Sequence, residues 1–114
     1  MKHPKYEEYK MNREYFDYNN NQYNCHLAIE HDKKMIIQEA ETRYNNFSEL
    51  YDKNTLRADK VRVYVLDNIP IYAMIIYIID YKNETGGRYA CGEYYPIDSN
   101  HLLLPHPYQG SICW

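Results

Sequence analysis

The sequence predicts an α+β fold in which one helix packs on a four-stranded antiparallel meander. Three observations indicate this class. Apolar residues recur at helical spacing over residues 27–44. After Phe47 the apolar pattern becomes alternating or continuous, which is typical of strands. The segments between these strands are short turns, and short turns join antiparallel neighbours.

Length and composition exclude several classes of protein. The chain has 114 residues, of which 45% are hydrophobic and 25% charged, a balance typical of one globular domain. The apolar run over residues 73–79 is far shorter than the ~20 residues that a membrane span requires. A net charge of −3 provides no overall attraction to nucleic acid. We therefore expect neither a membrane nor a nucleic acid as partner.

The first 24 residues are rich in tyrosine and contain no Leu, Ile or Val. Residues 5–16 are compatible with a helix, because Tyr9 and Phe16 lie seven positions apart and would share one face. The asparagine run at 19–21 would end such a helix, since asparagine side chains compete for backbone hydrogen bonds. We interpret residues 1–24 as a peripheral helix or a loose arm, followed by a single α+β domain over residues 25–114.

The clearest element is an amphipathic helix over residues 27–44. Its apolar positions recur at mixed steps of three and four, with charged residues between them. These positions are Ala28, Ile29, Met35, Ile36, Ala40 and Tyr44. The pair Asn45-Asn46 is expected to end the helix.

Four strands are expected after this helix. The first covers residues 47–51, and the second covers residues 60–66, where valines alternate with Arg62 and Tyr64. The third, residues 71–81, is almost wholly apolar and is predicted to be a central strand covered on both faces. The fourth is either 88–95 or 101–104. A sheet with an apolar face needs a covering helix, and residues 27–44 provide it.

The C-terminal residues contain the strongest candidate for a reactive site. Pro105 and Pro107 fix the backbone on either side of His106, and Gly110 permits a bend with positive φ before Cys113. A rigid histidine and a cysteine seven residues apart indicate a reactive-thiol site.

This segment resembles the active-site stretch of ubiquitin-conjugating enzymes, which carry His-Pro-Asn, a short loop, and then Gly-x-x-Cys followed by an apolar residue. His106-Pro107 and Gly110-Ser111-Ile112-Cys113-Trp114 match that pattern. The upstream order also matches, with a helix, a meander, Tyr95-Pro96 and a short strand before His-Pro. The resemblance covers residues 27–114 and is to the divergent bacterial or phage relatives of the family.

The resemblance implies ubiquitin-like-protein conjugation, in which Cys113 carries the modifier as a thioester and an amine then attacks it. It implies that His106 shapes the turn and that Tyr108 donates a hydrogen bond to the developing oxyanion. Gly110 and Trp114 would contribute to binding. The implied partners are a ubiquitin-like protein and an activating enzyme, with no cofactor.

The sequence departs from the family pattern at three points. Tyr108 stands where the family has asparagine, and the loop before Cys113 is shorter. The family continues with two or three helices, whereas this sequence ends one residue after Cys113. We therefore expect the C-terminal helices to be absent, as in a truncated form or a minimal relative.

Two alternatives remain open. Cys113 could be a small buried thiol, as free cysteines commonly are. The chain could also be a non-catalytic protein-binding module, such as a phage inhibitor or an operon accessory protein, that acts through its fifteen tyrosines. A homodimer formed through the tyrosines is a further option.

The pattern of histidines and cysteines favours no metal site. A set for zinc would consist of Cys91, His101, His106 and Cys113, but zinc sites usually begin with a tight cysteine pair. His26 and His31 lie on different faces of the predicted helix and are expected at the surface.

The three cysteines are interpreted as free thiols. Their number is odd, none form a Cys-x-x-Cys pair, and no signal segment opens the sequence. Cys25 and Cys91 are expected in the core. These features indicate a reducing compartment, so we expect a cytoplasmic protein.

Overall fold

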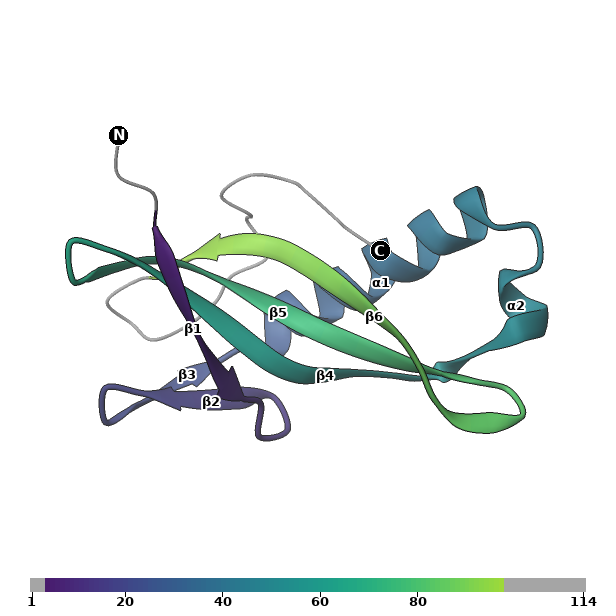
Figure 1. Cartoon of the computed structure of the whole chain (residues 1–114), viewed down its shortest axis with the longest axis horizontal. Coiled ribbons are helices and arrows are strands. Elements are labelled where there is room, and N and C mark those ends of the chain that lie inside the picture. Colours follow the sequence, from purple (N-terminus) through teal and green to yellow (C-terminus); the bar gives the residue numbers. More distant parts are fainter. Residues whose placement is uncertain (1–3, 98–114) are drawn as a thin grey trace.

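The computed structural model describes residues 4–97, except for the side chains of residues 84–86. These residues form six strands and two helices (Figure 1). In chain order they are β1 (Lys5–Lys10), β2 (Tyr15–Tyr18), β3 (Asn21–Asn24), α1 (His26–Arg43), α2 (Phe47–Leu50), β4 (Tyr51–Leu66), β5 (Ile69–Tyr81) and β6 (Glu84–Pro96). The α+β class, with a long helix on a four-stranded antiparallel sheet, is confirmed, and a short second helix adds to it.

The main sheet has the strand order β1-β4-β5-β6, and each neighbouring pair is antiparallel. The meander β4-β5-β6 is joined by tight turns. In the first turn Asp67 and Asn68 have φ values of 52° and 67°, which aspartate and asparagine adopt more readily than most residues. β1 pairs with only part of β4, from Lys60 to Val65, and β2 and β3 form a separate hairpin.

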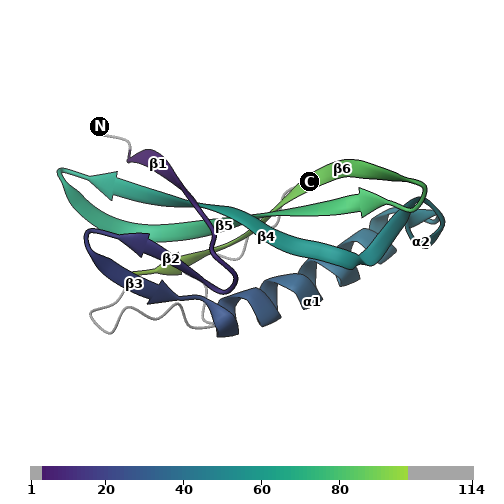
Figure 2. The same ribbon diagram turned by 90° about the horizontal axis from the view of Figure 1, so that it is seen from below.

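The helix α1 and the β2–β3 hairpin lie on the same side of the main sheet (Figure 2). We call this side of the sheet the inner face and the opposite side the outer face. Because successive strand residues point to opposite faces, Val61 and Val63 enter the inner core and are fully buried. Arg62 and Tyr64 of the same strand lie on the outer face.

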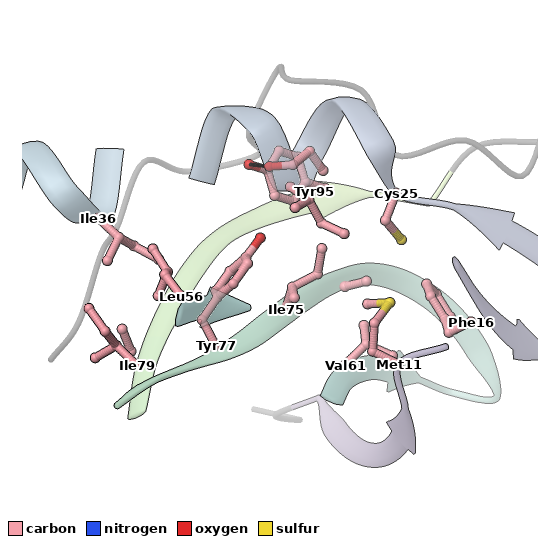
Figure 3. Packing of buried hydrophobic residues seen from close by; sticks show 14 of the residues in the cluster. Met11, Phe16, Cys25, Ile36, Leu56, Val61, Ile75, Tyr77, Ile79 and Tyr95 are labelled. Carbon is pink, nitrogen blue, oxygen red and sulfur yellow. Dashed lines mark hydrogen bonds between the residues drawn. The ribbon is translucent and has the colours of Figure 1, made fainter. Parts of the chain in front are cut away.

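The limits of α1 agree with the predicted helix within one residue at each end. Tyr44 is already in extended conformation. The buried positions of α1 form a stripe whose members are mostly four residues apart, and they are Ala28, Ile29, Asp32, Ile36 and Ala40. This stripe packs on the buried side chains of the inner face (Figure 3).

The strand β5 is the central strand that the sequence predicted. Ile75 pairs with Val61 and Ile76 pairs with Lys60, so these neighbours point to opposite faces. Their exposed fractions are 0% and 4%. At these positions β5 is buried on both faces, as predicted for the central strand.

The N-terminal residues form strands, so the prediction of a peripheral helix or loose arm is wrong. β1 joins the main sheet, and Met11, Phe16 and Tyr23 belong to the hydrophobic core. The seven-residue spacing of Tyr9 and Phe16 misled the prediction, because a reversal at Arg13, with φ of 59°, separates the two residues. Tyrosine favours strands, and that preference is decisive here.

Residues 47–50 form α2 and not the first predicted strand. Phe47 is buried in the core. β4 begins at Tyr51, before the start of the strand predicted at 60–66, and ends at Leu66 as predicted. A short apolar run does not distinguish a strand from one helical turn. The candidate strand at 88–95 is part of β6, whereas the candidate at 101–104 lies outside the described residues. None of the described helices is long and apolar enough to cross a membrane.

Candidate functional site

The predicted reactive residues all lie outside the described residues. They are His106, Tyr108, Gly110, Cys113 and Trp114. The structure describes the elements that precede them, from α1 through the meander to Pro96 at the end of β6.

The two cysteines within the described range differ. Cys25 is free and buried, as predicted. Burial, with the nearby charge of Asp32 adding to it, raises the pKa of the Cys25 thiol to about 12, so this thiol is a poor nucleophile near neutral pH. Cys91 is half-buried and disulfide-bonded. The prediction of a free thiol is therefore wrong for Cys91.

A carboxylate at the centre of the α1 stripe organises the inner face. Asp32 is fully buried. Its Oδ2 accepts a hydrogen bond from the Tyr77 hydroxyl at 2.6 Å. Its Oδ1 accepts one from the Tyr95 hydroxyl at 2.5 Å and one from the backbone N–H of Glu93 at 3.1 Å. Three donors from β5 and β6 thus converge on one side chain of α1, which fixes the helix on the sheet.

The backbone at Gly92 makes room for this carboxylate. A Cβ atom at Gly92 would lie 2.1 Å from Asp32 Oδ2. The pairing of β5 with β6 shifts register between Met74 and Ile76, next to Gly92. The resulting irregularity turns the Glu93 N–H toward α1, which is a typical use of a bulge.

Next to Asp32 lies a second pair of titratable groups. Glu93 has a side chain that is only 6% exposed, and its Oε2 lies 2.9 Å from His31 Nε2. His31 is therefore half-buried and paired with Glu93. The expectation that His31 is a surface residue is wrong. His26 is exposed, as expected, and pairs with Glu14 and Glu30.

Burial also changes the acidity of this cluster. It raises the pKa of Asp32 from 3.8 to about 6, although the hydrogen bonds from Tyr77, Tyr95 and Glu93 act in the opposite direction. Burial and the charge of Asp32 raise the pKa values of Tyr77 and Tyr95 far above the ordinary value of tyrosine. Both phenols therefore remain protonated donors at all ordinary pH values, and the cluster is suited to holding α1 in place.

The outer face of the sheet carries tyrosines from all four strands. We call Tyr6, Tyr64, Tyr72, Tyr89 and Tyr94 the tyrosine face. Ring centroids of Tyr6 and Tyr64 are 5.4 Å apart, and those of Tyr64 and Tyr72 are 4.9 Å apart. Tyr94 lies edge-on to both Tyr64 and Tyr72. These contacts connect β1, β4, β5 and β6 across one surface.

Cations border the tyrosine face. The Arg62 guanidinium lies 4.5 Å from the Tyr6 ring centroid, and Lys60 Nζ lies 5.6 Å from that of Tyr89. Glu8 of β1 pairs with both cations, at 2.8 Å from Arg62 Nε and 3.6 Å from Lys60 Nζ. The arrangement combines aromatic rings with charged groups, which suits contact with another macromolecule.

A second basic surface lies along α1. An open groove between α1 and the first half of β4 is bordered by Lys33, Lys34 and Lys53, with Ile37 and Glu41 beside them. Unlike the outer face, this groove has no aromatic side chain among its lining residues.

The described residues contain no group of three or more His, Cys, Asp or Glu side chains that could hold a metal ion. Of the zinc set that the sequence contained, only Cys91 lies within the described range. Comparison with known proteins found no match to a family model, to a curated protein or to a solved structure.

The sequence did not lead us to the Asp32 cluster, and it predicted a tyrosine-rich binding surface without identifying which tyrosines form it. A signal for the first was present, because Asp32 lies four residues from both Ala28 and Ile36 on the apolar stripe. A signal for the second was also present, because Arg62 and Tyr64 alternate with the buried valines of β4.

Proposed function

We propose that this protein is a ubiquitin-conjugating-type domain that carries a ubiquitin-like modifier as a thioester on Cys113. One observation supports the proposal above the others. A long helix precedes the meander β4-β5-β6 and packs on its inner face, and β6 ends at Tyr95-Pro96. This agrees with the order of helix, then meander, then Tyr95-Pro96 that the resemblance implies upstream of His106, although three strands follow α1 within the described residues and the fourth strand of the sheet, β1, precedes it.

The proposed reaction is a thioester exchange followed by transfer. The Cys113 thiolate attacks the carbonyl carbon at the modifier's C-terminus, a new S–C bond forms, and the thiolate of the activating enzyme leaves. Tyr108 donates a hydrogen bond to the developing oxyanion, and His106 shapes the turn. An amine of the substrate then attacks the thioester and releases Cys113 as a thiolate.

The proposal places the protein in a reducing compartment, the cytoplasm, because the reaction requires a free thiol. The disulfide at Cys91 makes the redox state part of the test. The exchange assay therefore includes a phosphine reductant, which opens disulfides without supplying a competing thiol.

The test uses ubiquitin with a C-terminal mercaptoethanesulfonate thioester as the donor. Intact mass spectrometry of the full chain should show one added ubiquitin, lost on treatment with hydroxylamine and absent in Cys113→Ala. Cys25→Ala is the matched control and should still form the adduct, because the Cys25 thiol is buried. An adduct that persists in Cys113→Ala would contradict the proposal.

A non-catalytic protein-binding module is the second candidate. The observation that favours it is the tyrosine face, which joins five aromatic rings and two cations on one exposed surface. Tyr6 and Tyr89 are the most exposed residues of the tyrosine face, at 49% and 53%.

The second candidate is tested by co-purification of the tagged chain from its host. Recovery of a partner should be lost in the double variant Tyr6→Ser/Tyr89→Ser and kept in Cys113→Ala. Recovery that is lost in Cys113→Ala but kept in the tyrosine variant would instead favour the thiol chemistry.

A further inference from the structure

Four rings of the tyrosine face, those of Tyr6, Tyr64, Tyr72 and Tyr94, pack against one another. Tyr64 and Tyr94 meet at an interplanar angle of 76°, and Tyr72 and Tyr94 meet at 70°. Tyr64, Tyr72 and Tyr94 are each half-buried. Neighbouring rings therefore cover part of each of these three rings.

The charged residues on this surface where β1 pairs with β4 are mostly positive. The register of β1 with β4 brings Glu8, Lys10, Lys60 and Arg62 onto the outer face with Tyr6 and Tyr64. Glu8 is the one carboxylate among these four residues, and it already pairs with Lys60 and Arg62. The set has a net charge of +2, although the whole chain has a net charge of −3. The end of the outer face where β1 pairs with β4 is therefore a basic patch on an acidic protein.

The distribution of charge and rings discriminates between classes of partner. A second copy placed face to face would oppose cations with cations, which is unfavourable. Single-stranded nucleic acid needs free aromatic faces on which its bases can stack, whereas here Tyr64, Tyr72 and Tyr94 pack against one another and are half-buried. An acidic protein surface offers carboxylates to Lys60 and Arg62 and to the tyrosine hydroxyls, and rigid tyrosines provide contact area at little cost in entropy.

We propose that the tyrosine face, together with Lys60 and Arg62, is the docking surface for an acidic region of a partner protein. This inference rests on the protein-binding function proposed above and adds the chemistry of the partner. The tyrosines provide the packed centre of the contact, and the two cations select carboxylates and orient the partner.

The experiment measures binding of a fluorescein-labelled glutamate decapeptide to the full chain by fluorescence anisotropy. The peptide should bind at low salt and weaken as the NaCl concentration rises, because surface charges are screened. The double variant Lys60→Glu/Arg62→Glu should weaken binding at least about tenfold, since rim and central charges at such contacts control affinity and association.

Two further variants keep the test decisive. Lys60→Gln/Arg62→Gln removes the charges without repelling Glu8, so it reports on binding if the glutamate variant does not fold. Lys33→Glu/Lys34→Glu makes the same charge change in the groove between α1 and β4. It should alter the affinity for the peptide by less than about twofold, because mutations at separate sites act independently. Thermal melts of all variants check folding.

Several outcomes would overturn the inference. They are absence of peptide binding at low salt, binding unchanged in both variants of Lys60 and Arg62, a larger loss in Lys33→Glu/Lys34→Glu, or preferential binding of a thymidine decanucleotide. The last result would assign the face to single-stranded nucleic acid.

The failure of this inference is distinguishable from failure of protein binding itself. If a host partner is lost in Tyr6→Ser/Tyr89→Ser but is retained by Lys60→Gln/Arg62→Gln, the protein-binding function stands and the acidic partner is refuted. If the tyrosine variant retains every host partner, the protein-binding function itself is refuted.

Discussion

The two faces of the sheet use tyrosine differently, and the neighbours Tyr94 and Tyr95 of β6 show the contrast. Tyr95 is fully buried on the inner face and donates its hydroxyl to Asp32. Tyr94 is half-buried on the outer face and contacts Tyr64 and Tyr72 through its ring. Two adjacent tyrosines of one strand thus contribute to different structures, one to a polar network in the core and the other to an aromatic surface outside.

This contrast separates two uses of one residue type. On the inner face the hydroxyl matters most, because a buried carboxylate needs hydrogen-bond donors. On the outer face the ring matters most, because a hydroxyl at the surface can exchange its partner for water. We therefore expect stability to depend on the inner tyrosines and recognition to depend on the outer ones.

The largest expected effect concerns the central strand, where both faces are covered. Ile75→Ala and Ile76→Ala should each lower the free energy of unfolding by about 2–5 kcal/mol, the usual cost of truncating a buried isoleucine. Ile69→Ala is the matched control, because Ile69 is 63% exposed, and it should change stability by less than about 0.5 kcal/mol. Urea denaturation measures all three. An Ile76→Ala midpoint equal to that of the wild type would show that the outer face is not packed at this position.

The second prediction concerns the buried charge of the inner face. The pKa of Asp32 is about 6 in the folded protein and 3.8 ordinarily, so folding favours the protonated form. Its contribution to stability is therefore full below about pH 4 and falls as the pH rises through 6, by roughly 3 kcal/mol at about 1.4 kcal/mol per pKa unit.

The variant Asp32→Asn isolates this contribution, because it keeps an acceptor oxygen for Tyr95 and the Glu93 N–H but carries no charge. Glu93, His31, Cys25, Tyr77 and Tyr95 also face or adjoin this position, and they are the same in both proteins. The stability of the wild type relative to Asp32→Asn should decrease between pH 4 and pH 7. A difference that is constant across this range would contradict a raised pKa for Asp32.

The third prediction concerns Gly92, which gives the carboxylate its space. Gly92→Ala should cost about 1–3 kcal/mol, because its Cβ would overlap Asp32 Oδ2. The cost should be smaller when Asp32→Ala is also present, since the two sites share one contact. Free energies of unfolding for the two single variants and the double variant complete the cycle, and strict additivity would show that the two residues do not interact.

The elements that the sequence predicted well are those with long periodic patterns. The apolar stripe of α1 and the continuous run of β5 extend over many residues, so they identified a helix and a buried strand. β1 has no such pattern, and its partner on β4 lies about sixty positions away, with Lys5 opposite Val65. Local periodicity cannot predict a pairing between segments so distant in the chain.

The described candidate sites could be predicted only in part, for the same reason. Asp32 was visible as a polar residue within an apolar stripe, but its donors Tyr77 and Tyr95 are 45 and 63 positions away. The fifteen tyrosines look alike in sequence. Only the register of the four strands, including the shift between Met74 and Ile76, shows which of them share the outer face.

The most direct test of the contrast between the two faces removes one oxygen atom at each of two adjacent positions. Tyr95→Phe deletes a buried donor to Asp32 and should lower the free energy of unfolding by about 1–3 kcal/mol. Tyr94→Phe deletes a hydroxyl on the outer face and should change it by less than about 0.5 kcal/mol. Equal losses for the two variants, or a larger loss for Tyr94→Phe, would contradict the division of roles between the inner and outer faces.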